Sequence, residues 1–186
     1  MSTEIQKMHN YESIEKFREA CQNFINRMNF EPKPESLGAT PDGKASTVNI
    51  SHIEMTLDEF FFGLWSTKNF KWEVIANEVV GSIDLEVLHP VSAHWITRSG
   101  AAAITIMVDK APIGVDRNSW ALNVNNKKPN ALYMGFPKLK AECLKNAANS
   151  LGKMFGRDLN RKNVDYFNPV QKQKFTPNAT NSTTGQ

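Results

Sequence analysis

The alternation of apolar and polar side chains in the middle of the chain constrains its fold more than any other feature. Apolar residues recur at every second position in two stretches: Phe70, Trp72, Val74 and Ala76, then Ile83, Leu85 and Val87. This period is typical of strands in an antiparallel sheet that buries one face. Residues 95–97 and 101–108 continue the β pattern, and we expect a turn at residues 98–100 between them.

A long helix is predicted after the sheet, beginning at Pro137, because proline is tolerated in the first turn of a helix. Its apolar positions recur at helical spacing: Leu139, Cys143, Leu144, Ala147, Ala148, Leu151 and Phe155. Gly152 and Gly156 fall within this stretch, and each costs about 1 kcal/mol relative to alanine in a helix interior. We expect the close approach of another backbone, or of a phosphate chain, to offset that cost. The predicted fold class is therefore α+β.

The N-terminal part predicts an amphipathic helix over residues 1–30. Its apolar residues recur every three or four positions: Tyr11, Ile14, Phe17, Cys21, Phe24, Ile25 and Met28. Such a helix covers the sheet or clasps a neighbouring subunit, and the sequence leaves both readings open. Residues 31–45 are rich in proline and glycine and predict a linker or a long loop.

The next segment predicts a short strand near residues 48–53 and then a short apolar helix. Thr56 and Glu59 have the spacing of a capping box, which favours a helix over residues 60–65. Its three consecutive phenylalanines are expected in the core. We divide the chain into an N-terminal helix (1–30), a linker (31–45), a core domain (46–168) and a disordered polar tail (169–186).

The charge of the chain is divided unevenly along its length. Residues 1–126 carry 11 Lys and Arg against 16 Asp and Glu, a net charge of −5. Residues 127–186 carry 11 Lys and Arg against Glu142, Asp158 and Asp165, a net charge of +8. A basic block on a mildly acidic protein favours phosphate binding, although a solvated helix face has the same composition.

The sequence lacks the motifs of several functional classes, among them nucleotide-binding enzymes and membrane proteins. No phosphate-binding P-loop and no dinucleotide-binding glycine motif is present, and the four histidines are scattered. We therefore expect no enzymatic activity, no cofactor and no metal. No apolar run is long enough to span a membrane, and residues 1–10 lack the apolar region of a signal peptide. A cytoplasmic protein is expected.

Residues 143–167 resemble the signature helix of the Rad-fifty-two type of single-strand annealing proteins, a family that includes the phage Sak-type proteins. The positions that fall on the family pattern are Leu144, Lys145, Ala147, Ser150, Gly152, Gly156, Asp165 and Tyr166. The layout of residues 45–167, with a short apolar helix, then strands and a long helix, is similar to the family's β-β-β-α core. The resemblance implies that sheet packed against a long C-terminal basic helix.

The resemblance also implies a DNA-binding face. Lys145 and Lys162 match lysines that face DNA in the family, whereas Asn146 and Asn149 stand where the family has arginine. Charge from the following turns compensates for those arginines, and His52 lies near a basic position of the family. The complete expected set is Lys145, Asn146, Asn149, Lys153, Arg157, Arg161, Lys162, Lys127, Lys128, Lys138, Lys140 and His52.

Two pairs of lysines in that set have a second reading. Lys127 and Lys128 precede the predicted helix, and they contact a second strand or lie in solvent. Lys138 and Lys140 lie at the predicted helix start, where the helix dipole disfavours positive charge and a bound phosphate would relieve it.

The function implied by the resemblance is ATP-independent binding of single-stranded DNA and annealing of complementary strands, in recombination and repair. The family forms rings or filaments, so a homo-oligomer is expected, with the complementary strand as a further partner. A nuclease or a single-strand-binding protein is an allowed partner. One alternative is a protective single-strand-binding protein that does not anneal. Another is a phage or plasmid interaction protein whose basic helix binds an acidic partner.

Overall fold

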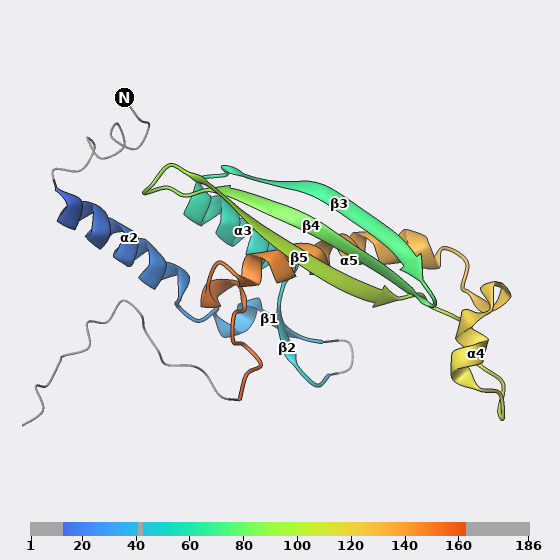
Figure 1. Cartoon of the computed structure of the whole chain (residues 1–186). Helices are drawn as coiled ribbons and strands as arrows, with labels where there is room; N and C mark the ends of the chain where they lie inside the picture. Colours follow the sequence, from blue (N-terminus) through green and yellow to red (C-terminus); the bar gives the residue numbers. More distant parts are fainter. Residues whose placement is uncertain (1–12, 41–42, 163–186) are drawn as a thin grey trace, which may run out of the picture.

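The computed structural model describes residues 13–40 and 43–162 and shows a mixed α/β protein with helices packed on one face of an antiparallel sheet (Figure 1). The sheet consists of β3 (Trp65–Ile75), β4 (Glu78–Leu88) and β5 (Trp95–Thr105), with β4 in the middle. The α-helices of the described residues are α2 (Ile14–Met28), α3 (Ile50–Phe61), α4 (Arg117–Leu122) and α5 (Ala131–Asn149). The antiparallel sheet that the alternation predicts is confirmed.

The central strand β4 shows how the alternation positions the sheet. Ile83, Leu85 and Val87 are buried beneath the helices. Asp84 and Glu86 lie between them and therefore on the opposite face, because successive side chains of a strand alternate in direction. One face of the sheet thus belongs to the core, and the other carries charged side chains.

Strand β5 runs without a break through residues 98–100, so the turn predicted there is wrong. Gly100 is buried because α5 crosses the strand at this point. A Cβ at position 100 would collide with the carbonyl oxygen of Cys143 and the amide nitrogen of Ala147. The glycine marks a close contact between helix and sheet rather than a turn. Gly81 of β4 marks a second close contact with α5, nearer the N-terminal end of that helix, where a Cβ would lie 2.9 Å from Cδ2 of Leu139.

The long helix after the sheet exists, but its predicted bounds are wrong at both ends. Helix α5 begins at Ala131 and contains Pro137, and it ends at Asn149. The chain then turns through a short 3₁₀ segment, η3 (Lys153–Phe155). A Cβ at Gly152 would collide with the carbonyl of Met28, so the predicted close approach of another backbone is confirmed there. Gly156 adopts a φ of 97°, which an α-helix does not allow.

Helix α2 confirms the predicted N-terminal helix over the part that is described; residues 1–12 lie outside it. Ser13 caps the helix by accepting a hydrogen bond from the backbone nitrogen of Lys16 at 3.2 Å. Only Phe24 and Met28 are buried, and Phe24 packs edge-to-face against Phe60 and Phe61 of α3. The helix therefore attaches through its C-terminal half, mainly to α3, and Phe24 also packs on His89 at the end of β4.

Part of residues 31–45, where the sequence predicts a linker or a long loop, is regular structure. The segment contains η1 (Pro34–Ser36) and β1 (Leu37–Ala39). Strand β1 pairs antiparallel with β2 (Ser46–Val48), which overlaps the strand predicted near residues 48–53 only at Val48. The two strands form a hairpin beside α5 (Figure 1).

Helix α3 begins much earlier than the capping-box pattern predicts. Its N-cap is Asn49, so residues 50–53 are helical and not part of a strand. Thr56 is buried inside the helix, where its hydroxyl donates to the carbonyl of His52 at 2.6 Å. Phe60 and Phe61 belong to the core as expected, while Phe62 ends the helix with a φ of 54° and its side chain is exposed.

A projection made of residues 107–130 extends from the end of the sheet at which β5 finishes (Figure 1). It contains α4 and η2 (Val124–Asn126), and we refer to it as the arm. Within the described ranges, no helix has both the length and the apolar character that crossing a membrane requires. Residues 163–186, including the predicted polar tail, lie outside the description.

Candidate nucleic-acid interface

A groove lies between the β1–β2 hairpin and the free edge of β5, with α5 as its floor. It consists of two adjoining hollows of about 180 and 520 Å³. Both are lined by the same four residues, which mark where they meet: Thr40, Thr47, Glu142 and Asn146. Among the described residues β5 pairs only with β4, so the edge of β5 along the groove is not used by the sheet.

One stripe of α5 provides the polar side chains of this floor. Lys138, Glu142, Lys145 and Asn149 follow each other at spacings of four, three and four residues, which places them on one side of a helix. All four line the groove. The opposite side of α5 is apolar and packs on the sheet, and this division explains why the polar stripe faces outward.

Lys145 is the most enclosed cation of the groove, with a side chain that is 12% exposed. Its Nζ lies 2.8 Å from Oε1 of Glu142 and 3.0 Å from the hydroxyl of Thr47 on β2. The lysine therefore joins α5 to the hairpin, and Glu142 neutralises it. Removing Lys145 would leave a partly buried carboxylate without its partner, so this residue has a structural role besides any role in binding.

The two asparagines that stand where the annealing proteins have arginine also have structural partners. The Asn146 amide donates to the carbonyl of Ala101 at 2.8 Å and ties α5 to the edge of β5. The surroundings of the Asn149 amide assign its nitrogen to the side of the carbonyls of Lys145, at 3.3 Å, and Phe155, because only that orientation lets it donate to both. It therefore holds the turn that follows α5. Asn146 remains exposed in the groove, while Asn149 is half-buried.

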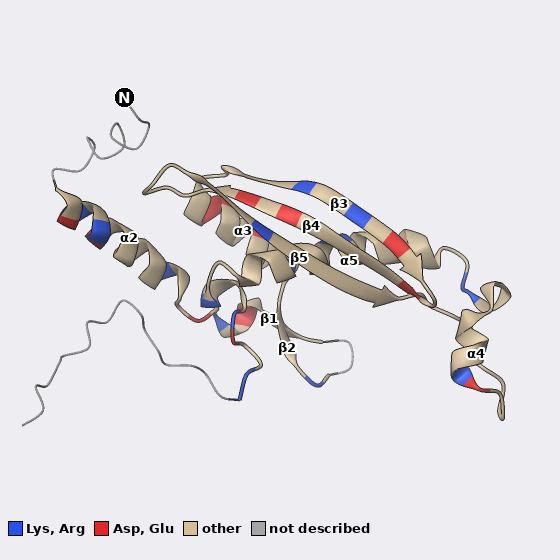
Figure 2. Cartoon of the chain, viewed as in Figure 1, with Lys and Arg blue, Asp and Glu red and all other residues tan. Residues whose placement is uncertain are grey.

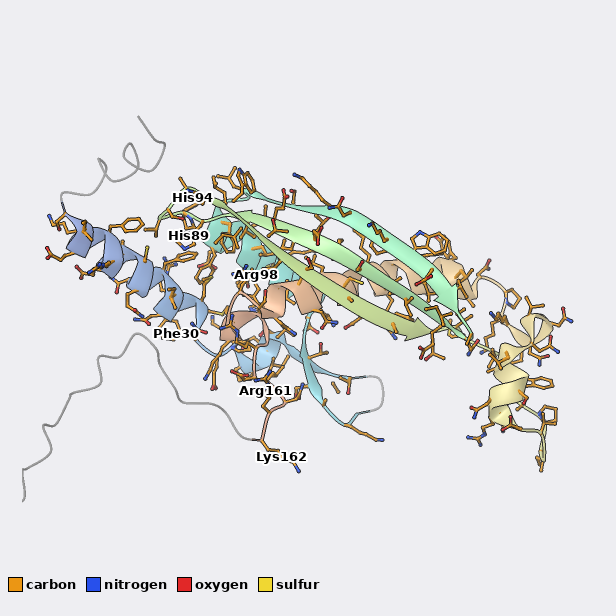
Figure 3. All side chains as sticks on the ribbon, in the orientation of Figure 1. Phe30, His89, His94, Arg98, Arg161 and Lys162 are labelled. Carbon is orange, nitrogen blue, oxygen red and sulfur yellow. The ribbon has the colours of Figure 1, made fainter. Side chains whose placement is uncertain are left out.

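A group of cations follows α5, and we call it the basic turn: Lys153, Arg157, Arg161 and Lys162. Arg157 donates from Nε to the carbonyl of Asn149 at 3.3 Å and from Nη2 to the carbonyl of Ser150. It thereby satisfies the carbonyls that the helix end leaves open. Arg161 pairs with Asp158 at 3.1 Å. Figure 3 shows Arg161 and Lys162 projecting on the outer side of the turn.

The basic turn borders the groove. Leu159 lines both the inner hollow of the groove and a small neighbouring hollow of about 260 Å³, whose other walls include Lys153, Arg157 and Arg161. Figure 2 shows several Lys and Arg beside the hairpin and on the segment after α5, together with a few acidic residues, while β4 carries acidic residues and β3 carries charges of both signs. The groove and the basic turn together form the candidate interface.

Four of the expected residues lie elsewhere. Lys127 and Lys128 belong to the arm, where the backbone of Lys127 bridges to Val108. His52 lies on α3 and lines a separate cavity of about 730 Å³. Lys140 is exposed on α5 but lines none of these hollows.

The structure also places three residues in the site that the sequence did not indicate. Thr47 bonds Lys145, and Asn160 bonds the backbone of Ser46 in both directions, at 2.9 and 2.7 Å. These contacts connect positions about a hundred residues apart, so no local sequence pattern could predict Thr47 or Asn160 as part of the site. Glu142 could have been found, because it precedes Lys145 by three residues on a predicted helix, a spacing at which opposite charges meet.

No protein-family model matches this sequence, and no curated protein matches it significantly. The resemblance to annealing proteins therefore rests on the residues quoted above. Among the described residues, no three His, Cys, Asp or Glu side chains gather into a group that could hold a metal ion. The polar side chains of the groove itself are threonines, a serine, lysines, asparagines and Glu142, which offer hydrogen bonding and charge.

Proposed function

We propose that this protein binds single-stranded DNA in the groove and anneals complementary strands without ATP, as a homo-oligomer. The observation that carries the proposal is the open groove with Lys138 and Lys145 on its floor and the basic turn at its border. Such a site contacts phosphates without reading bases, because lysine and arginine neutralise backbone charge and release counterions. The three consecutive strands β3, β4 and β5 and the long helix α5 that packs on them further support the similarity to the β-β-β-α core of the annealing family, although α4 and η2 stand between β5 and α5 in the chain.

The edge of β5 adds a feature suited to a strand of nucleic acid. Ala102 and Ala103 have small side chains and line the groove together with Thr105. Backbone N–H groups that no neighbouring strand uses can donate to phosphate oxygens. A strand held by its phosphates between this edge and the lysines of α5 keeps its bases available for a complement. Annealing requires no bond chemistry beyond this presentation.

The test is an annealing assay with two complementary labelled oligonucleotides at low and moderate salt. The variant Lys138→Ala/Lys153→Ala/Lys162→Ala removes three cations whose side chains form no ion pair or hydrogen bond with another described residue. Its matched control, Arg18→Ala/Lys68→Ala/Lys71→Ala, removes the same charge from α2 and β3, which contribute no residue to the hollows of the groove and the basic turn. We expect the first variant to lose most of its annealing rate and the control to keep it.

The salt dependence of binding separates this proposal from its alternatives. Each lost phosphate contact lowers the slope of log affinity against log salt by about 0.7 for a single strand. If the wild-type protein binds oligonucleotides but leaves the pairing rate unchanged, it is a protective binder. If it binds no oligonucleotide at low salt, the proposal is wrong and the basic turn serves an acidic protein partner.

A further inference from the structure

The arm is an ordered segment without a core of its own. Within residues 107–130 no side chain is buried. Large apolar side chains are instead exposed along it: Met107, Ile113, Val115, Leu122 and Val124. Leu132, Tyr133 and Met134 extend this exposed set into the first turn of α5, at the base of the arm. So many large exposed apolar side chains on one short segment are a feature of surfaces that contact another molecule.

Specific hydrogen bonds nevertheless give the arm a defined shape. Trp120 donates from its indole nitrogen to the carbonyl of Asp109 at 2.9 Å, and Asn126 donates to the carbonyl of Trp120 at 3.0 Å. Asp116 caps α4 by accepting from the backbone nitrogen of Ser119 at 2.8 Å. Fixing the backbone of each residue costs about 1–2 kcal/mol of conformational entropy, and the arm buries no apolar side chain that would offset the cost. A docking partner would provide that burial.

The exposed side of α3 complements the arm in charge and in apolar character. The arm carries four basic and two acidic residues, a net charge of +2: Lys110, Arg117, Lys127, Lys128, Asp109 and Asp116. Residues 50–62 carry Glu54, Asp58 and Glu59 and no lysine or arginine, a net charge of −3. Met55 and Phe62, which are 69% and 76% exposed, lie among these carboxylates.

The two surfaces adjoin opposite ends of the sheet. Trp65, which follows α3, is in register with Val87 and through β4 with Ile96, at one end. Residues 75, 78 and 105 are in register at the other end, where the arm begins. Figure 1 shows the same separation. One copy cannot bring its arm to its own α3, but a second copy can receive it.

We propose that the arm of one copy docks on the acidic, apolar side of α3 of the next copy. The contact joins two different surfaces and is therefore heterologous, so repetition produces a ring or a filament. The inference rests on the homo-oligomer of the proposed function and names its interface. It also places the groove of each copy in a repeating array, which multiplies the affinity of one groove.

Charge reversal on each side provides the test, with the full chain and no DNA. Lys110→Glu/Arg117→Glu changes the arm from +2 to −2, and Glu54→Lys/Glu59→Lys changes residues 50–62 from −3 to +1. Light scattering after size exclusion should show an oligomer for the wild type and a mass near the 20.9 kDa monomer for either variant alone. An equimolar mixture should assemble again, because each arm then meets an α3 of opposite charge. Ile113→Asp/Leu122→Asp, which changes only exposed side chains, should be monomeric and folded by circular dichroism.

The outcomes separate this interface from the proposed function. A monomeric wild type, or variants that assemble as the wild type does, would overturn the interface. If such a protein still anneals oligonucleotides, the groove proposal stands without it. If the mixture assembles as expected but the wild type does not bind DNA, the interface stands and the proposed function fails. Variants that stay monomeric when mixed also overturn the interface.

Discussion

Lys145 and Glu142 lie one turn apart on α5, and the ammonium of the lysine is 2.8 Å from a carboxylate oxygen of the glutamate at the floor of the groove. Their side chains are 12% and 35% exposed. Glu142 therefore occupies the position at which a phosphate of a bound strand would meet Lys145. In this structure Glu142 neutralises the most enclosed cation of the groove, and in the proposed complex a phosphate would compete with it for Lys145.

Removing the charge of Glu142 should strengthen DNA binding. In Glu142→Gln the amide oxygen still accepts the hydrogen bond of Lys145, while the groove gains one unit of positive charge. We expect roughly a threefold to tenfold higher affinity for single-stranded DNA at low salt, because a like charge near a phosphate costs on the order of 1 kcal/mol. Fluorescence anisotropy with a labelled oligonucleotide measures it. Glu78→Gln, at the far tip of the β3–β4 hairpin, is the matched control, and an equal gain in both variants would refute a local role.

Gly100→Ala should destabilise the protein strongly. The new methyl group would meet the backbone of α5, which cannot rotate away as a side chain can. Overpacking of this kind costs about 3 kcal/mol. Gly135→Ala is the control: its Cβ has open space, and alanine gains up to about 1 kcal/mol over glycine within a helix. In urea unfolding, Gly100→Ala should have a lower midpoint concentration than the wild type, and Gly135→Ala should have an equal or higher one. If Gly100→Ala and the wild type had equal midpoints, the backbone of α5 would not pack as closely on β5 at Gly100 as the structure shows.

Alanine variants of Arg157 and Arg161 should differ in their effect on stability and agree in their effect on DNA binding. Arg157→Ala removes the hydrogen bonds to two carbonyls at the end of α5, and we expect a loss of about 1 kcal/mol. Arg161→Ala breaks only a surface pair with Asp158 and should change stability by less than about 0.5 kcal/mol. Both variants remove one positive charge, so both should weaken oligonucleotide binding. Thermal unfolding and anisotropy on the same samples test this, and a destabilised Arg161 variant would contradict it.

The parts of the fold that follow from local periodicity were predictable from the sequence. Alternation in β4 gave the antiparallel sheet, and helical spacing gave α2 and the middle of α5. The errors occur where a distant contact decides the local structure. Gly100 is a strand residue because α5 crosses it, and Gly152 ends the helical stretch beside Met28. The residues that Gly100 and Gly152 contact are distant from them in the sequence.

The candidate site was predictable to a similar extent. The basic character of α5 and its following turn is visible in the charge distribution, and the groove gathers Lys138, Lys145 and Asn146. What the sequence could not show is which cations are already engaged. Arg157 caps a helix whose end was not foreseen. The hairpin that forms the other wall lies in a segment whose proline and glycine content resembles that of a linker.

The tip of the β4–β5 hairpin carries a histidine that links pH to stability. His89 packs edge-to-face on Phe24 of α2, with ring centroids 4.8 Å apart, and its Nδ1 accepts from the backbone nitrogen of Ser92 at 3.1 Å. Figure 3 shows His89 and His94 together beside α2. Burial, and to a lesser degree the charge of His94, lowers the pKa of His89 below its usual value. The folded protein therefore favours the neutral ring.

Stability should consequently fall as the pH drops below about 6.5, the usual pKa of histidine. In that range the unfolded chain takes up a proton at this position and the folded chain does not, so protons favour unfolding. We expect the melting temperature to decrease between pH 7.5 and pH 5.5, a range above the titration of the carboxylates. His89→Asn keeps a side-chain acceptor for Ser92 and should flatten the profile. His94→Asn should keep most of the slope, because burial is the larger cause. A wild-type profile that is flat over this range, or a slope that persists in His89→Asn, would show that another group is responsible.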